Sequence, residues 1–532
     1  MKQLFIFSLF SFLCFVSCKE KREEKATKPN IVIIYTDDQG YGDVSALNPQ
    51  AKFQTPNIDK IANEGVVFTD GHSSDAVCTP SRYSLLTGRY SWRTSLKKGV
   101  LRADGPCLVE KDRMTIASML KDNGYNTAMV GKWHLQMDFV GELGINRDWS
   151  QPFVDGPIDK GFDYFFGIPA SMNFGVLTYL ENDRVLEPPI LWTKKKKNKN
   201  PRTYKNANPA DYRMTPPFEE KPFQENPIRG LEVAPSFNDE LVLKTFAEKA
   251  VERINILAEE AKNGKPFFLY MPLTSPHLPH CTHPDFQGRT SCGNYGDFME
   301  ETDYRVGQVL DALEKSGVAD NTLIIFSSDN GAETNYTYQR ETYSHYSCMN
   351  FKGGKRDIYE GGHRVPFLMR WPAAIKSGTK IDSPVCQSDY MATIADILEI
   401  EIPDNAGEDS FSLWPLLSED VQEYNYDRSV IHHSASGHFA IRKGDWKLNM
   451  LRGSGGSFKP QFIDVKEGDA PYELYNLKND PGETTNLYFE KPEIVETLKN
   501  EITQIIKTGR STIGEPQDYI KENWPQVDWV NL

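Results

Sequence analysis

The chain has 532 residues, 39% of them hydrophobic and 25% charged, which is the composition of a globular protein too long for one compact core. We therefore expect a large domain and a smaller one. Sixty lysines and arginines against 74 aspartates and glutamates give a net charge of −14, so the chain is not expected to bind nucleic acid, and an anionic ligand would need a local cluster of positive groups.

The N-terminus predicts export. The apolar run from Leu4 to Val16 is too short to span a bilayer and is typical of a secretory signal. The segment "FVSC" resembles a bacterial lipobox, although Phe15 replaces the usual leucine. We expect a signal peptide at residues 1–17, lipidation of Cys18 and a charged tether at residues 18–28; a plain signal peptide is the alternative. Such a chain would be an exported bacterial lipoprotein, anchored to a membrane of the cell envelope in the periplasm or on the outer surface.

Four apolar segments that end in polar residues predict strands buried on both faces. They are "NIVIIYTDD", "YNTAMVGKWH", "KPFFLYMPLTSPH" and "NTLIIFSSDNG". Helical patterns precede the last three, in "MTIASMLKDNG", in residues 238–263 and in residues 302–315. This alternation predicts an α/β domain with a mostly parallel sheet. The polar ends of the strands should converge, because ligands of such sheets bind beyond the carboxyl ends of the strands.

The remaining segments predict an insertion and a small C-terminal unit. Between residues 181 and 235 the pattern gives way to proline, asparagine and lysine, including "KKKKNK" at 194–199. This predicts a surface insertion whose lysines are solvent-exposed or contact a polyanionic substrate. Short strand-like pieces followed by a helix over residues 492–508 predict an α+β subdomain. The expected domains are therefore 29–424, which contains the insertion, and 425–532.

The eight cysteines do not follow a metal-binding pattern. Once Cys14, Cys18 and Cys78 are set aside, five scattered cysteines remain without a CxxC pair or zinc spacing. A metal–thiolate site is therefore not expected, whereas one or two disulfides are possible. Cys281 and Cys292 are the expected pair because they lie close together in the sequence.

Oxygen donors follow two of the predicted strands. Asp37 and Asp38 end the first strand, and Asp329 and Asn330 end the last. Carboxylate and amide oxygens suit a hard cation, with calcium the first expectation and magnesium the second. Either pair alone would favour an ordinary Asx turn, but two pairs at equivalent strand ends favour a metal site.

Cys78 is predicted to lie at the start of a helix. Pro80 suits an early helical position, Gly88 is a helix stop signal, and Arg82 lies one turn after the cysteine on the same face. A helix N-terminus with a guanidinium group can bind an oxyanion, and the same field would lower the pKa of a thiol. The residues alone thus allow either an anion site or a reactive cysteine.

Two longer segments carry a family resemblance. "AVCTPSRYSLLTG" and "GYNTAMVGKWH" resemble, in the same order, the two signatures of the type I, formylglycine-dependent sulfatases. The resemblance runs from "NIVIIYTDDQGYGD" to "ELYNLKNDPGETTNL" and implies an alkaline-phosphatase-like (sulfatase) α/β fold. In this fold a large mixed, mostly parallel sheet lies between helices, with a smaller C-terminal α+β subdomain. "PDFQGRTSCGNYGDFMEETD" is similar to arylsulfatase A and N-acetylgalactosamine-6-sulfatase, which favours a 6-O-sulfated hexose.

The resemblance implies a modified residue and a metal. Cys78 would be converted to formylglycine (3-oxoalanine) by a formylglycine-generating or sulfatase-maturating enzyme, and its hydrated aldehyde would be a geminal diol. The implied calcium ligands are Asp37, Asp38, Asp329, Asn330 and an oxygen of residue 78. The other implied catalytic residues are Arg82, which orients the diol, Lys132, His277 and Lys355, which contact the sulfate or the leaving oxygen, and His134, the base that breaks down the enzyme ester.

The implied chemistry has two steps. One diol oxygen attacks sulfur, and the alcohol leaves with a proton from His277. His134 then removes the proton of the remaining hydroxyl, which expels inorganic sulfate and restores the aldehyde. The positive groups stabilise charge on the sulfate oxygens in a site from which water is excluded.

The substrate is expected to be a sulfated carbohydrate, such as ulvan, carrageenan, fucan or a glycosaminoglycan. His280 and His433 are predicted to contact it from loops at the rim. For His72, His345 and His363 a structural role is expected, and for Trp92 and Trp133 buried packing. Two alternatives stay open: a phosphate or phosphonate ester hydrolase of the same superfamily, which the metal ligands disfavour, and a non-catalytic carbohydrate-binding lipoprotein.

Overall fold

The structure is a computed structural model that describes residues 28–142, 146–192, 232–418, 427–522 and 524–530. The predicted signal peptide, the lipidation site Cys18, nearly all of the tether and the lysine run at 194–199 lie outside these residues. Within the described ranges, no helix has both the length and the apolar character needed to cross a bilayer.

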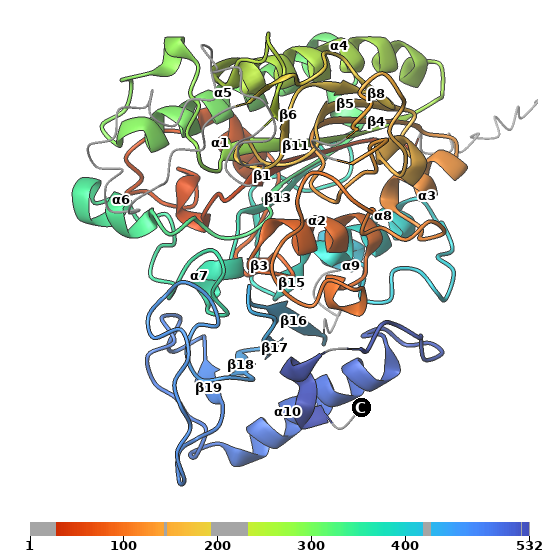
Figure 1. The fold of residues 1–532 in the computed structure, drawn as a ribbon. Helices are drawn as coiled ribbons and strands as arrows, with labels where there is room; N and C mark the ends of the chain where they lie inside the picture. Colours follow the sequence, from red (N-terminus) through yellow and green to blue (C-terminus); the bar gives the residue numbers. More distant parts are fainter. Residues whose placement is uncertain (1–27, 143–145, 193–231, 419–426, 523, 531–532) are drawn as a thin grey trace, which may run out of the picture.

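A mixed, mostly parallel sheet forms the centre of the large domain (Figure 1). Its strand order is β14-β2-β13-β12-β1-β11-β4-β5-β7-β8. The five strands from β12 to β5 run parallel, whereas β13 is antiparallel to both of its neighbours and β7 and β8 end the sheet in antiparallel pairs. Its strands are β1 (Asn30–Asp37), β2 (Val66–Phe68), β4 (Asn126–Lys132), β5 (Tyr164–Ile168), β7 (Leu180–Glu181), β8 (Arg184–Val185), β11 (Phe267–Pro276), β12 (Thr322–Ser328), β13 (Phe367–Arg370) and β14 (Thr379–Ile381). The predicted fold class is confirmed.

Helices cover both faces of this sheet because its central strands are apolar on both sides. Ile31 and Ile33 of β1 pack in one core, and Val32 and Ile34 pack in the other. Helices α2, α3 and α8 cover the first face and α1, α4 and α5 the second (Figure 1). The helices are α1 (Pro56–Asn63), α2 (Cys78–Thr87), α3 (Ile116–Asp122), α4 (Val242–Lys262), α5 (Gly293–Lys315), α6 (Tyr336–Tyr343), α7 (Glu360–His363), α8 (Tyr390–Ile397), α9 (Trp414–Leu417) and α10 (Pro492–Thr508).

Helix α5 begins nine residues earlier than the sequence pattern predicts. Its first turns contain Gly293 and Gly296, which have low helix propensity. Tyr295, Phe298 and Met299 are nevertheless buried there. Their packing outweighs the local preference, and this is why the pattern alone placed the start too late.

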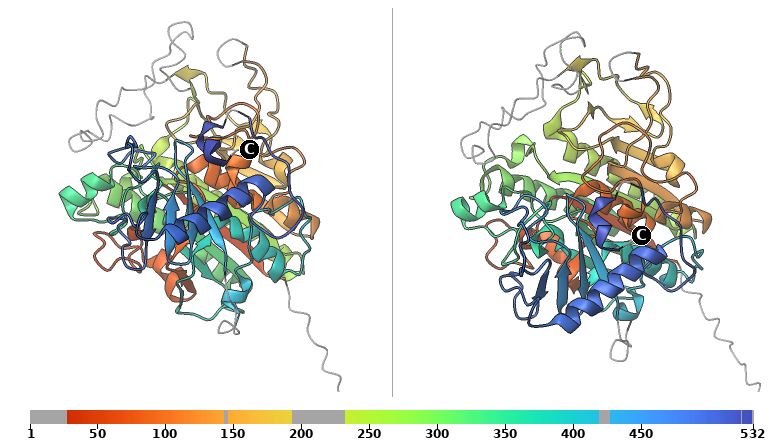
Figure 2. Two further views of the ribbon diagram at one scale, coloured as in Figure 1. Left: turned by 90° about the horizontal axis from the view of Figure 1, so that it is seen from below. Right: turned by 60° about the horizontal axis from the view of Figure 1, so that its bottom comes forward.

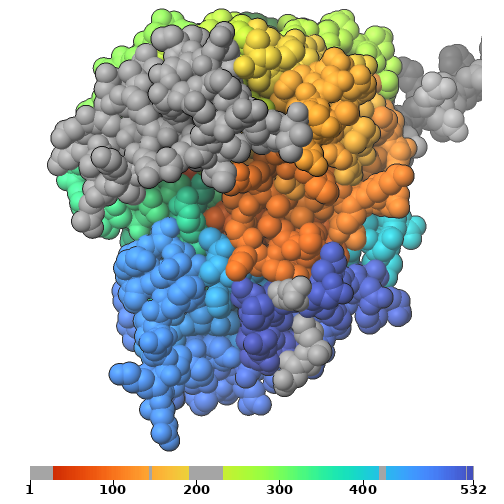
Figure 3. Space-filling model, viewed as in Figure 1, coloured from red at the N-terminus to blue at the C-terminus, as the bar shows by residue number. Residues whose placement is uncertain are grey.

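The C-terminal subdomain is an antiparallel sheet with α10 packed against it (Figure 2). Its strands are β16 (Ser429–His433), β17 (Phe439–Lys443), β18 (Trp446–Asn449) and β19 (Glu473–Asn476). Tyr90 and Trp92, which follow α2, belong to the same hydrophobic core. The subdomain therefore packs directly on the segments that follow α2, and the two surfaces are continuous in the space-filling view (Figure 3). The remaining described strands are short: β3 (Gly71–His72), β15 (Val385–Cys386), β6 (Val176–Leu177), β9 (Leu191–Trp192) and β10 (Glu232–Val233).

The predicted disulfide between Cys281 and Cys292 is wrong. Cys292 is a free thiol 3.5 Å from Gln339 Oε1. Cys281 instead donates a hydrogen bond to Asp239 Oδ2 at 3.2 Å. Closeness in the sequence predicted the wrong pair because the two side chains enter different hydrophobic cores. Cys292 lies in the core at the start of α5, and Cys281 lies in the core beneath the central sheet. A disulfide requires Cβ atoms that face each other, which sequence spacing does not specify.

A buried ion pair ties the segment after α2 to the loop before α9. Arg93 Nη2 lies 2.7 Å from Asp409 Oδ1 and Arg93 Nε 2.8 Å from Oδ2, and both side chains are fully buried. Removing one charge leaves the other buried and unpaired. We expect Asp409→Asn to lower the free energy of unfolding by about 3–5 kcal/mol in urea titrations.

The exposed pair between Asp404 and Arg510 provides the control. The Asp404 side chain is 50% exposed, so Asp404→Asn should change the free energy of unfolding by about 1 kcal/mol or less. Equal effects of the two substitutions would contradict a structural role for the buried pair.

Candidate active site

Four neighbouring parallel strands bring polar residues to one edge of the sheet. Asp37 ends β1, Lys132 ends β4, His277 follows β11 and Asp329 follows β12. Because these strands are adjacent and point the same way, their carboxyl ends meet. The convergence predicted from the sequence is therefore observed.

Three carboxylates at this edge are paired with three cations. Lys132 Nζ lies 2.5 Å from Asp37 Oδ2. Lys355 Nζ lies 2.7 Å from Asp38 Oδ1. The Arg82 guanidinium donates to Asp329 Oδ2 through Nε at 3.0 Å and Nη2 at 2.7 Å. All six residues are at most 3% exposed, and buried ions persist only when they are paired in this way.

The pairing moves the acidities of two carboxyl groups in opposite directions. Burial alone would raise the pKa of Asp37, but Lys132 and His277 hold it below its usual range. Burial and the neighbouring Asp37 carboxylate raise the pKa of Asp329, although Arg82 opposes them. Two close carboxylates thus share one set of positive groups, as expected for like charges in one site.

The same residues could hold a divalent cation. Asp37 Oδ1 and Asn330 Oδ1 are buried and accept no hydrogen bond from any described residue. One ligand atom each from Asp37, Cys78 and Asp329 lie within 4.8 Å of one another. Buried oxygens without partners are costly, and oxygen donors are those that calcium and magnesium prefer. The arrangement therefore fits a hard cation bound beside residue 78.

Cys78 is the first residue of α2, with Val77 as N-cap and Gly88 in the left-handed conformation as C-cap. The predicted helix bounds are confirmed, but the expected lowering of the thiol pKa is wrong. Burial raises the pKa of Cys78 to about 11, although Lys132 and Lys355 oppose it. Desolvation exceeds the favourable charges because the thiol is only 1% exposed. An unmodified Cys78 is therefore a protonated thiol at neutral pH.

His134 is held as a neutral imidazole. Its Nε2 lies 3.0 Å from the Leu101 carbonyl oxygen, so Nε2 carries the hydrogen, and Nδ1 is buried with no partner among the described residues. Burial, and next Lys132, hold the pKa of His134 well below its usual value. An unprotonated nitrogen whose tautomer is fixed by a carbonyl is suited to accept a proton.

A cavity of about 450 Å³ opens on this site and is lined by Cys78, His277 and Lys355. His277 Nδ1 lies 2.5 Å from the Leu278 carbonyl oxygen and therefore carries a hydrogen, while Nε2 lies 3.7 Å from Asp38 Oδ2. His277 can thus donate from Nε2 only after that nitrogen is protonated. The cavity is within the usual size range of small-molecule sites.

The structure does not place the two predicted substrate-binding histidines in this cavity. His433 is 3% exposed, and its Nδ1 lies 3.2 Å from Asp75 Oδ1. His280 packs against the Tyr295 ring, and burial lowers the pKa of His280 to about 3. The sequence gave no information on which way these side chains face, and His433 ends strand β16 instead of lying in a loop.

Sequence reasoning missed several polar residues that do line the cavity, among them Asn173, Glu333, Asn335 and Arg356. Two signals could have found some of them. Glu333 lies three residues after the metal-ligand candidate Asn330, and Arg356 follows Lys355 directly. Asn173 has no comparable neighbour in the sequence.

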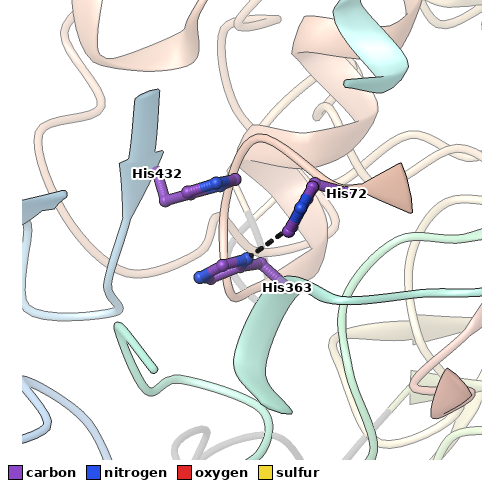
Figure 4. A group of neighbouring side chains, drawn as sticks. All are labelled: His72, His363 and His432. Atoms are coloured by element: carbon purple, nitrogen blue, oxygen red, sulfur yellow. Dashed lines mark hydrogen bonds between the residues drawn. The ribbon is translucent and has the colours of Figure 1, made fainter. Parts of the chain in front are cut away.

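A second cluster of histidines lies outside the cavity, where the C-terminal subdomain meets the large domain (Figure 4). His72 Nδ1 and His363 Nδ1 are 3.0 Å apart, and the rings of His363 and His432 stack with centroids 3.7 Å apart and planes at 7°. An imidazole binds a metal in the plane of its ring, so two parallel stacked rings cannot share one ion. His432 Nδ1 instead donates to the Ser73 carbonyl oxygen at 3.3 Å.

This cluster makes stability depend on pH. Burial, with positive and histidine neighbours, holds the pKa of His432 well below 6.5, so the folded chain does not bind the proton that the unfolded chain binds. Stability is therefore lost as the pH falls below the unfolded value. His432→Gln keeps an N–H donor but does not titrate. For each pH unit below 6.5, the free energy of unfolding of this variant should fall by up to about 1.4 kcal/mol less than that of the wild type. Urea unfolding between pH 7.5 and 5 measures this difference. An identical pH dependence would show that His432 is charged in the folded chain.

Comparisons with known proteins match nearly the whole chain. A family model described as Sulfatase matches residues 29–400, and one described as the C-terminal part of N-sulphoglucosamine sulphohydrolase matches residues 352–508. An N-acetylgalactosamine-6-O-sulfatase of Bacteroides thetaiotaomicron is 32% identical over 93% of this chain and 96% of its own length. Human arylsulfatase A is 30% identical over 93% of this chain and 92% of its own length.

A solved structure agrees with these matches. A B. thetaiotaomicron protein, described in connection with the metabolism of glycosaminoglycans, has a TM-score of 0.75 and 29% identity. The alignment covers 90% of this chain and 99% of that chain.

Proposed function

Because the chain belongs to the sulfatase family and is a sulfuric ester hydrolase, as predicted, we propose that it hydrolyses carbohydrate sulfate esters. The reaction would use a calcium ion and a formylglycine that is made from Cys78. The observation that carries the proposal is the position of residue 78. It starts α2 and lines the cavity, and the charged groups that act on it are Lys132, Lys355, Asp329 and Asp37.

The state of the thiol supports modification. A buried Cys78 with a raised pKa carries little thiolate, which is the reactive form of cysteine. As formylglycine, residue 78 would supply a hydrated aldehyde as an oxygen nucleophile. Because the side chain is 1% exposed in the folded chain, the maturating enzyme would act before folding is complete.

Calcium would be held by Asp37, Asp38, Asp329 and Asn330, together with residue 78. The unpartnered oxygens of Asp37 and Asn330 support this assignment. The ion would supply positive charge beside the sulfur, which stabilises charge on the sulfate oxygens. Lys355 lines the cavity, and its ammonium group is placed to add to that charge.

Two histidines would move protons. His277, protonated at Nε2, would give a proton to the departing alcohol oxygen. His134 would accept a proton at Nδ1, because Nε2 is committed to Leu101. Arg82 contacts Asp329 and the Lys132 carbonyl oxygen and would keep the carboxylates in position. These are general acid, general base and electrostatic roles.

The substrate would be a sulfated sugar, with a 6-O-sulfated hexose or hexosamine favoured. The name of the B. thetaiotaomicron relative supports this choice. Export as a lipoprotein, suggested by the N-terminal sequence, would place the enzyme in the cell envelope, where it would meet polysaccharides such as glycosaminoglycans.

Substitution of residue 78 tests this proposal. The wild type, coexpressed with a formylglycine-generating enzyme, should release sulfate from N-acetylgalactosamine 6-sulfate and react with an aminooxy probe. Cys78→Ala should do neither, with kcat reduced by about 10³-fold or more because the nucleophile is lost. It should still bind the sugar sulfate in calorimetry, since Lys355 and His277 remain.

Cys348→Ala is the matched control. It removes another buried free thiol that does not line the cavity, and it should keep both activity and probe labelling. A Cys78→Ala variant that still releases sulfate, or a wild type that is active without an aldehyde, would contradict the proposed mechanism.

A further inference from the structure

The cavity contains an ion pair that the proposed mechanism does not use. Arg356 donates to both carboxylate oxygens of Glu333, through Nη1 to Oε1 and through Nη2 to Oε2 at 2.9 Å. Both residues line the cavity. Lys355 Nζ lies 3.5 Å from Glu333 Oε2, so the pair directly borders the region where the sulfate would bind.

The backbone of Arg356 is held in an uncommon conformation. Its φ is +83°, in the left-handed region that residues with long side chains rarely adopt. Its N–H donates to the Ala76 carbonyl oxygen at 2.7 Å, and its own carbonyl oxygen accepts from the Ala435 N–H at 3.0 Å. Ala76 precedes Cys78 by two residues. Strained residues of this kind gather at functional sites, where surrounding contacts fix the side chain in position.

The pair can bind hydroxyl groups. Glu333 is 6% exposed, whereas the Arg356 side chain is 36% exposed. Two of the five guanidinium N–H groups bond Glu333, and no other acceptor among the described residues takes a hydrogen bond from that side chain. A hydroxyl both donates and accepts hydrogen bonds. Adjacent hydroxyls can therefore bridge a carboxylate and a guanidinium, while Glu333 repels a second sulfate at the same place.

Two amide oxygens of the cavity strengthen this interpretation. Asn335 is 5% exposed, and its Oδ1 is buried without a hydrogen-bond partner among the described residues. The same is true of Asn173 Oδ1. Both residues line the cavity. Unsatisfied buried acceptors need an explanation, and hydroxyl or amide hydrogens of a bound sugar would satisfy them.

We propose that Glu333 and Arg356 form the sugar-binding part of this site and recognise two adjacent, unsulfated hydroxyls on the ring that carries the reacting sulfate. This inference rests on the proposed function and narrows its substrate. The preferred unit is a hexose or hexosamine with one sulfate and a free vicinal diol. A second sulfate on that diol should prevent cleavage.

The test separates sugar binding from sulfate chemistry. The first probe is the 6-sulfate of galactose, N-acetylgalactosamine or N-acetylglucosamine, whichever the wild type hydrolyses most rapidly. The second probe is the 3-deoxy analogue of that sugar sulfate. The third is 4-nitrophenyl sulfate, which has no ring hydroxyls. In Arg356→Met the ratio of kcat/KM for the sugar sulfate to kcat/KM for 4-nitrophenyl sulfate should fall about tenfold or more, because Arg356 would contact the sugar ring of the substrate and not its sulfate.

Two further measurements locate the effect. Removing the 3-hydroxyl should lower kcat/KM in the wild type but not further in Arg356→Met, because the two changes remove the same contact. Arg356→Lys keeps the charge but loses the bidentate geometry, so it should lower the ratio in the same direction. Arg356→Lys also controls for a folding defect that only the methionine causes. Thermal unfolding of both variants tests directly for such a defect.

Glu64→Gln is the matched control. It breaks a comparable pair with Arg370, whose Nη2 lies 2.9 Å from Glu64 Oε2 outside the cavity, and should leave the ratio unchanged. An equal fall for both substrates in Arg356→Met, or a wild type that hydrolyses only 4-nitrophenyl sulfate, would overturn the hydroxyl-binding assignment alone. A matured wild type that hydrolyses no sulfate ester would overturn the proposed function and this inference with it.

Discussion

The site depends on three carboxylates buried opposite three cations at the carboxyl ends of parallel strands. Asp37, Asp38 and Asp329 cannot remain ionised in the interior unless positive groups compensate them. Arg82, Lys132 and Lys355 do so from three separate elements, at 2.5–2.7 Å. Strand ends, the start of α2 and the loop that carries Lys355 are therefore fixed relative to one another by charge as well as by packing.

The C-terminal subdomain takes part in holding residue 78. His432 bonds the Ser73 carbonyl oxygen, His433 pairs with Asp75, and the Ala435 N–H bonds Arg356. Two of these contacts hold the segment that leads into Cys78, and the third holds the cavity wall. The subdomain thus helps to hold residue 78 and the proposed sugar-binding pair in position together.

Much of the fold and the core of the site could be predicted from the sequence. The strands have clear apolar runs, α10 has strong helical periodicity, and α2 is bounded by Pro80 and Gly88, so local patterns were sufficient. The strand-end residues followed from the geometry of parallel sheets. Desolvation could not be predicted: the pKa of Cys78 rises because the whole of α2 is buried, which depends on the folded surroundings. Side-chain direction was equally inaccessible, and this is why the sequence did not show that Glu333 and Arg356 line the cavity whereas His280 and His433 do not.

The central claim is that the strand-end carboxylates form a calcium site beside residue 78. It is tested most directly by the thermal unfolding of the chelator-treated protein with and without added calcium. The account predicts that calcium raises the unfolding midpoint of the wild type, because a ligand that binds only the folded state stabilises it, and that Asp37→Asn largely abolishes this shift. No shift in the wild type, or an equal shift in both proteins, would contradict the account.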